Sequence, residues 1–276
     1  MVFFVLIGVI QSCIPPQTET SEVKINISED LTQQYILELS YRQHQDSLYF
    51  FLSHPNASYR YLAANALRSF ISTEHLDTLL SKLQDPVPEV VGAAAQALGQ
   101  LGSQGVESGL TDAFVRSDSV GDWVQTNKSI LEALGKIGSI NQHEYIAQVS
   151  TYLPTDTALV TGMARSLYYF SRRKIVSENG VLKAMSLLNA NDYKALIRIY
   201  AAYYLKNTTL ELLSDQSDTL LHFLRVENNS EVRLPLIEAI AKTKNDQVYQ
   251  YLVEHFDKAK DYREKVAIIN NLHHFD

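Results

Sequence analysis

A pattern of apolar, small and polar positions with helical spacing recurs along most of the chain. Its clearest copy spans residues 85–102, Asp-Pro-Val-Pro-Glu-Val-Val-Gly-Ala-Ala-Ala-Gln-Ala-Leu-Gly-Gln-Leu-Gly, and follows a short amphipathic segment at residues 76–83. Aligned on the first leucine of this copy, the copies place one large aliphatic residue every 31 to 38 residues: Leu67, Leu98, Leu134, Leu167, Leu205, Ile240 and Leu272. A period of this length, with small changes in the loops, predicts a stack of helix pairs.

Each copy predicts a short outer helix followed by a longer inner helix, because no single pair could bury its apolar face alone. The inner helices are expected at residues 57–70, 88–101, 120–137, 157–171, 193–206, 230–243 and 261–274. Residues 29–45 come before the first copy and carry Leu31, Ile36 and Leu39 at helical spacing, which predicts an N-terminal capping helix. The stack itself is expected to span residues 46–276.

Two further kinds of position keep the same phase as the leucine. The position seven residues before it holds Arg60, Val91, Asn127, Val160, Arg198, Arg233 and Lys265, so four of the seven are basic. Small residues stand where helices are expected to cross closely: Ala63, Ala66, Ala94, Ala97, Ala133, Ala164, Ala201, Ala202 and Ala239. We expect the three arginines to bond polar groups at the turns before them, Asn56, Asp192 and Glu231, and so to tie neighbouring pairs together.

Residues 85–102 resemble a HEAT repeat, most closely the short variant of the phycobilin-lyase-like group. The resemblance lies in the Asp-Pro start, the run of alanines and the Leu-Gly-x-Leu-Gly end. It implies an all-α fold, an α-solenoid or superhelix of about seven HEAT-like helix pairs, whose inner helices line a concave face. Small, basic and leucine positions kept in one phase favour this fold over an irregular helical bundle.

The N-terminal end carries an apolar run at residues 2–10, which is too short to span a bilayer and is typical of a signal-peptide core. Ile10-Gln-Ser-Cys13 follows it and resembles the lipobox of bacterial lipoproteins. The resemblance implies a signal peptide over residues 1–12, an acylated Cys13, and an address in the bacterial cell envelope, at the outer membrane facing the periplasm. Residues 13–28, rich in Pro, Thr and Ser, are expected to form a lipidated flexible tether. A buried N-terminal segment with an incidental cysteine is the alternative.

Composition and motifs exclude several classes of function. The 276 residues include 24 Lys and Arg against 31 Asp and Glu, a net charge of -7, so no nucleic-acid partner is expected. The single Cys excludes a disulfide framework and a cysteine-built zinc site. The eight His are scattered, and the sequence contains no phosphate-loop, dinucleotide-binding, nucleophile-elbow or zinc-protease motif. We therefore expect no catalytic residue, no cofactor and no metal.

One position of each inner helix can form hydrogen bonds in every copy. We call these residues the polar ridge: Asn65, Gln96, Glu132, Arg165, Tyr203, Glu238 and Asn270. On a concave face this ridge would form a binding surface, and its candidate residues are Tyr61, Asn65, Gln96, Lys128, Glu132, Arg165 and Tyr203. The alternative is that an exposed helix position is polar without binding anything.

These patterns favour a non-catalytic scaffold that binds a protein or peptide in the bacterial envelope and is tethered to the membrane through Cys13. A second hypothesis comes from resemblance alone. The chain is similar to the N-terminal region of HEAT-repeat lipoproteins that carry a cyclophilin-type peptidyl-prolyl isomerase domain, which implies an accessory or substrate-binding role. No cyclophilin catalytic sequence occurs in these residues, so no isomerase residue is assigned. A third hypothesis, bilin attachment, follows the phycobilin-lyase-like resemblance and conflicts with an envelope address.

Overall fold

The computed structural model describes residues 20–70, 74–103, 105–114 and 121–275, and these residues form two layers of helices. The helices of the inner layer stack each on the next along the chain. They are α1 (Leu31–Tyr41), α3 (Ala57–Leu67), α5 (Pro88–Leu101), α7 (Val124–Ile137), α9 (Thr157–Arg172), α11 (Ala195–Asn207), α14 (Ser230–Ala241) and α16 (Tyr262–Asn271). From α3 onward they fall at the seven predicted inner positions.

The elements of the outer layer each lead into the inner helix that follows, and all except α15 are shorter than that helix. They are α2 (Gln45–Phe51), α4 (Leu76–Ser81) with η1 (Lys82–Gln84), α6 (Glu107–Ala113), α8 (Ile140–Ala147), α10 (Glu178–Ser186), α12 (Leu210–Leu213) with η2 (Ser214–Gln216) and α13 (Ser217–Val226), and α15 (Asp246–Lys258). A last turn, η3 (Leu272–Phe275), follows α16. In the described ranges the sole pairing of β type is an isolated bridge between Thr20 and Asn56.

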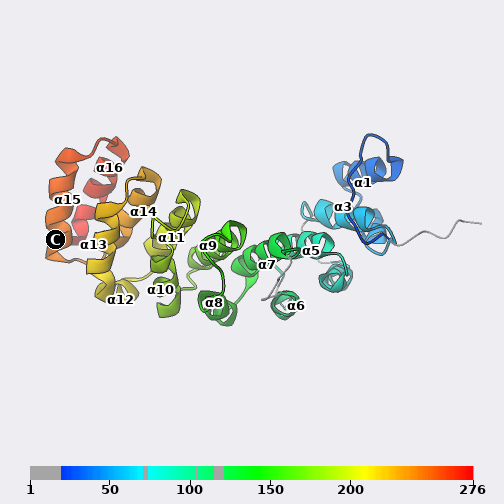
Figure 1. Cartoon of the computed structure of the whole chain (residues 1–276), viewed down its shortest axis with the longest axis horizontal. Helices are drawn as coiled ribbons and strands as arrows, with labels where there is room; N and C mark the ends of the chain where they lie inside the picture. The colour runs from blue at the N-terminus through cyan, green and yellow to red at the C-terminus, as the bar shows by residue number, and fades with distance from the viewer. Residues whose placement is uncertain (1–19, 71–73, 104, 115–120, 276) are drawn as a thin grey trace, which may run out of the picture.

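The stack forms an elongated arc (Figure 1). Both of its ends, at α1 and at α16, turn toward the side on which the inner helices lie, while α6, α8 and α10 lie on the opposite side. The inner helices therefore line the concave face, as the resemblance to HEAT repeats implies. The described residues thus form an all-α solenoid of seven helix pairs stacked along one axis, which confirms the predicted fold class.

The predicted phase of the repeat is correct in every copy. The aligned aliphatic residues from Leu67 to Ile240 are buried, and Leu272 is half-buried. The aligned alanines are buried as well, because the inner helices approach one another closely at these points. A Cβ on Gly99 would lie 2.7 Å from the Cα of Ala133, and one on Gly135 would lie 2.6 Å from the Cα of Ser166. Glycine at these two crossings lets α5, α7 and α9 pack backbone against backbone.

Three buried arginines of the inner helices bind carboxylates that belong to the next helix pair. The Nε atoms lie 2.7 to 3.0 Å from the carboxylate oxygens in the pairs Arg60–Asp85, Arg198–Glu227 and Arg233–Glu264. Each guanidinium also donates to backbone carbonyls before its own helix, such as those of His54 and Pro55 for Arg60. One side chain therefore joins two successive turns, and we call these three pairs the arginine clamps.

The predicted side-chain partners of these arginines were wrong. Asn56 accepts from the backbone of Ser58 at the start of α3. Asp192 accepts from Asn189, and Glu231 accepts from the exposed Arg263. The turn before each arginine supplies backbone carbonyls, which bind only part of the guanidinium, so the charge is compensated by a carboxylate of the following turn. This partner forms two parallel hydrogen bonds with Arg60 and with Arg198, the strong geometry for this pair of groups.

Residues 20–28, part of the predicted tether, pack against the first repeats. The Thr20 hydroxyl accepts from the backbone N–H of Ala57, and the Lys24 N–H donates to the Ser58 hydroxyl at 2.7 Å. Val23 packs against a small apolar cluster that includes Val87. Several backbone groups of residues 20–28 are therefore bonded to the solenoid, and the division of the chain into signal peptide, tether and solenoid stays a prediction. Cys13 and the predicted signal peptide lie outside the described residues.

A second buried polar group joins α8, α10 and α11. The His143 ring is fully buried, and its Nε2 lies 3.0 Å from the Tyr204 hydroxyl. The Ser177 hydroxyl lies 3.4 Å from Nδ1 of the same ring. Gly180 leaves the space for this contact, since a Cβ there would lie 2.0 Å from the tyrosine oxygen. Burial lowers the pKa of His143 to about 4, although the nearby Glu144 acts in the opposite direction.

Candidate binding surface

The middle of the concave face contains a hollow of about 300 Å³. Its walls come from the inner helices α5, α7 and α9 and from the residue that ends α3. We call it the basic hollow, and its lining residues are Arg68, Gln96, Gln125, Lys128, Ser129, Glu132, Ala133, Lys136 and Arg165. Since every wall belongs to the inner layer, the hollow opens on the concave side of the arc.

The basic hollow is positively charged, although the chain as a whole carries a net charge of -7. Its lining holds four cationic side chains and one carboxylate, Glu132. Burial lowers the pKa of Lys136, Glu132 raises it, and the cations Arg68 and Arg165 lower it further, with a net decrease. An anion placed here would reduce this repulsion between like charges.

Hydrogen bonds between successive inner helices fix the side chains at the base of the hollow. Arg165 of α9 donates to Glu132 of α7 at 2.9 Å and to the Tyr200 hydroxyl of α11 at 3.0 Å. Gln96 of α5 donates to the Ser129 hydroxyl of α7 at 2.7 Å. Ser129 is buried, whereas the other four side chains are half-buried, so their partners hold them in place while part of each stays open to solvent. The surface is thus preorganised across four helix pairs.

Half-buried tyrosines continue this surface toward the C-terminal side. We call them the tyrosine bed: Tyr168, Tyr169, Tyr200 and Tyr203 of α9 and α11. The ring of Tyr168 lies 5.6 to 5.8 Å from the other three. Cations lie over these rings, with the Arg165 guanidinium 5.1 Å from the centre of Tyr200 and the Lys136 ammonium 5.7 Å from that of Tyr169. Through these contacts of Arg165 and Lys136, the basic hollow and the tyrosine bed form one continuous surface.

The structure brings four of the seven predicted binding residues into the basic hollow: Gln96, Lys128, Glu132 and Arg165. Asn65 borders it, because its side chain accepts from Arg68 at 3.0 Å. Tyr203 belongs to the tyrosine bed, whereas Tyr61 packs on the apolar cluster that holds Val23 and lies outside both.

Sequence reasoning missed four polar residues that line the hollow, Arg68, Gln125, Ser129 and Lys136. Arg68 and Lys136 stand at or near the ends of their helices, where a cation is favoured by the helix dipole whether or not it binds a ligand. Their shared face could be recognised only from the stacking of α3 on α5 and of α5 on α7. A basic residue three positions from a ridge residue, as in Asn65 and Arg68, is the signal that was available.

The described part of the chain offers neither a metal site nor a membrane-spanning helix. Across residues 20–70, 74–103, 105–114 and 121–275, no group of three or more His, Cys, Asp or Glu side chains could hold a metal ion. The same residues include no helix that is both long enough and apolar enough to cross a bilayer.

Comparison with known protein families supports the repeat in part of the chain. Residues 46–125 match the family model described as HEAT repeats. No curated protein sequence matches the chain significantly. Among solved structures, the crystal structure of an engineered protein is 17% identical with a TM-score of 0.47, covering 84% of this chain and 96% of that one. Human deoxyhypusine hydroxylase in complex with glycerol is 15% identical with a TM-score of 0.36, covering 90% of this chain and 98% of that one.

Proposed function

We propose that this protein is a non-catalytic scaffold that binds a protein or peptide on its concave face and is held at the bacterial envelope by a lipid on Cys13. The observation that carries the binding role is the basic hollow with its adjoining tyrosine bed. Polar, cationic and aromatic side chains gather there, fixed by hydrogen bonds between helix pairs, and remain half-exposed. Arginine and tyrosine are also the side chains that most often dominate binding energy at protein interfaces.

Replacing Gln96, Glu132, Arg165 and Tyr203 together by alanine is expected to weaken partner binding by at least about tenfold. Arg165 and Glu132 are removed as a pair, so neither charge is left without its partner. The partner is first identified by crosslinking from a residue of the hollow in cells, and its affinity for the purified variants is then measured by calorimetry.

The matched control is a set of residues on the outer layer, Lys82, Asp112 and Gln148, also replaced by alanine. This set is expected to leave partner affinity within about twofold, because the outer layer faces away from the hollow. Circular dichroism of both variants checks that the helical fold is kept. Equal loss from the two sets, or no loss from the concave set, would show that the polar ridge is only a solvated face.

The lipid anchor rests on the lipobox resemblance at Cys13. If Cys13 is acylated, the full-length protein is expected to partition with membranes into detergent, and Cys13→Ala is expected to move most of it into the soluble fraction. A single acyl chain binds membranes weakly and reversibly, whereas two or more anchor a protein stably. Labelling with an acyl-chain precursor checks the modification directly, and an unlabelled wild-type protein would contradict it.

The accessory role beside an isomerase domain stays a prediction from the sequence resemblance.

A further inference from the structure

The basic hollow is positively charged, whereas the chain as a whole has a net charge of -7. The lining has four cations, and its one carboxylate, Glu132, already accepts a hydrogen bond from Arg165. Two of the other cations bond neutral amides instead: Lys136 donates to Gln100 at 3.1 Å and Arg68 donates to Asn65 at 3.0 Å. Three positive charges, those of Arg68, Lys128 and Lys136, therefore exceed what the hollow itself neutralises. Such an excess attracts and orients an anionic ligand.

The surroundings of the hollow indicate what kind of anion fits. The tyrosine bed follows directly. Its half-buried rings offer aromatic area with hydroxyl groups at their edges, and a cation lies 5.1 to 5.9 Å from the centre of each ring. A ligand that covers both parts must carry negative charge at one end and apolar side chains at the other. The concave arc also continues beyond the hollow in both directions, so an extended chain can lie along it (Figure 1).

We infer that the basic hollow and the tyrosine bed bind an acidic peptide segment, whose Asp and Glu carboxylates contact Arg68, Lys128, Lys136 and Arg165 and whose neighbouring apolar side chains lie on the tyrosine rings. This inference rests on the proposed scaffold function and names the chemistry of its partner. A nucleic acid fits less well, because it carries a charge on every nucleotide and would be repelled by an otherwise acidic protein.

The test measures the binding of labelled peptides to the full-length protein by fluorescence anisotropy. The probe is a peptide of about ten residues, which spans roughly 30 Å when extended, with Glu in its first half and Leu, Pro and Tyr in its second. Two comparison peptides carry Gln or Lys in place of Glu. We expect the acidic peptide to bind at least about tenfold more tightly than either, and its affinity to fall as salt is raised.

The variant Arg68→Gln, Lys128→Gln, Lys136→Gln removes the excess charge and leaves the Arg165–Glu132 pair in place. We expect it to weaken binding of the acidic peptide by about tenfold or more and to flatten the salt dependence. The control variant Arg42→Gln, Lys258→Gln, Lys260→Gln makes the same change of charge at exposed positions near the two ends of the solenoid, and should stay within about twofold of wild type. If the triple variant does not fold, Arg68→Gln alone, at an exposed position, gives the same comparison with a smaller effect.

Several outcomes would overturn the inference. Equal weakening by the two triple variants would mean that the effect comes from net charge and not from the hollow. Tighter binding of a single-stranded oligonucleotide than of the acidic peptide would assign the hollow to nucleic acid. A protein partner that depends on the polar ridge while the acidic peptide does not bind would contradict this inference and leave the scaffold function standing.

Discussion

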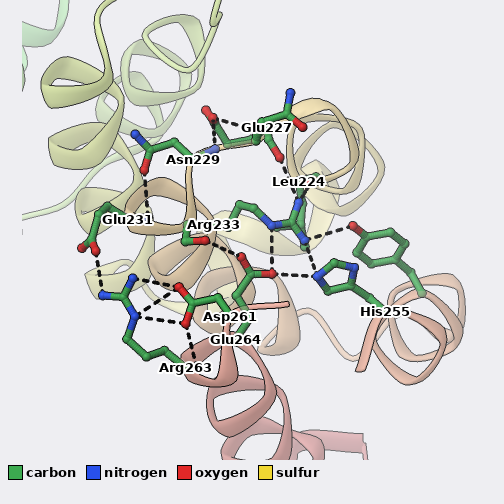
Figure 2. A network of polar contacts seen from close by, with 12 residues as sticks. Leu224, Glu227, Asn229, Glu231, Arg233, His255, Asp261, Arg263 and Glu264 are labelled. Carbon is green, nitrogen blue, oxygen red and sulfur yellow. Dashed lines mark hydrogen bonds and ion pairs between the residues drawn. The ribbon is translucent and has the colours of Figure 1, made fainter. Parts of the chain in front are cut away.

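Replacing Arg233 by leucine is expected to lower the free energy of unfolding by about 3 kcal/mol, because the carboxylate of Glu264 would stay buried without its cation. Glu264 is 4% exposed and Arg233 is 6% exposed. Burial alone would raise the pKa of Glu264, and hydrogen bonds from His255 and Arg233 lower it below its ordinary value. Figure 2 shows the guanidinium between Glu264 and the carbonyls of Leu224 and Glu227, to which it donates at 2.5 and 3.0 Å. The measurement is chemical unfolding at neutral pH followed by circular dichroism.

The same region supplies the matched control. Arg263 bonds Asp261 at 2.8 Å and Glu231 at 2.7 Å (Figure 2), but Arg263 and Glu231 are exposed and Asp261 is only half-buried. Arg263→Leu is therefore expected to change stability little, since exposed ion pairs contribute weakly. The double variant Arg233→Leu, Glu264→Leu should be more stable than Arg233→Leu alone, because it leaves no buried carboxylate uncompensated. Equal losses from Arg233→Leu and Arg263→Leu would contradict a stabilising role for the buried clamp.

The clamps also show which part of the fold the sequence could predict. A helix is specified by neighbours three and four positions away, so residues 88–101 predict α5 with its observed bounds. The partner of a clamp arginine lies 25 residues ahead for Arg60 and 31 residues ahead for Arg233. These separations differ because Asp85 caps the end of η1 before α5, whereas Glu264 lies in the first turn of α16, so the two carboxylates occupy different positions of their repeats. The position of the arginine in the repeat was thus predictable from the sequence, whereas its carboxylate partner could be assigned only from the fold.

The same distinction applies to the binding surface. Gln96, Glu132 and Arg165 were predictable as one surface because each occupies the same position of its repeat. Arg68 and Lys136 were not, because they occupy different positions of their repeats and meet only where α3, α5 and α7 stack. The charge of the hollow is accordingly a property of the assembled arc. The repeat fixes the spacing of side chains along the concave face. Residues that differ between repeats decide which chemical groups meet at the hollow.

Acidification from pH 7 to pH 4 is expected to cost the wild-type protein roughly 3 kcal/mol of stability through His143 alone. The ordinary pKa of His is 6.5, and burial among Tyr204, Ser177 and Phe170 lowers that of His143 to about 4. Between these two values the unfolded chain binds a proton that the folded chain does not. Protonation therefore favours unfolding, so stability is full above pH 6.5, falls as the pH drops through this window, and levels off below about pH 4.

The variant His143→Gln isolates this contribution. Glutamine keeps a polar group toward the Tyr204 hydroxyl and cannot be protonated in this range, so its stability curve should lack the His143 decrease. Burial raises the pKa values of Glu227 and Glu264, and their hydrogen-bond partners, including the clamp arginines, lower them to a net decrease. Protonation of these two carboxylates on acidification therefore also lowers the stability of the protein, by the same amount in the wild type and in the variant. The difference between the two curves should therefore change by roughly 3 kcal/mol between pH 7 and pH 4. Parallel curves, or an NMR titration of the His143 ring with a midpoint near 6.5, would show that the buried ring takes up its proton as readily as one in water.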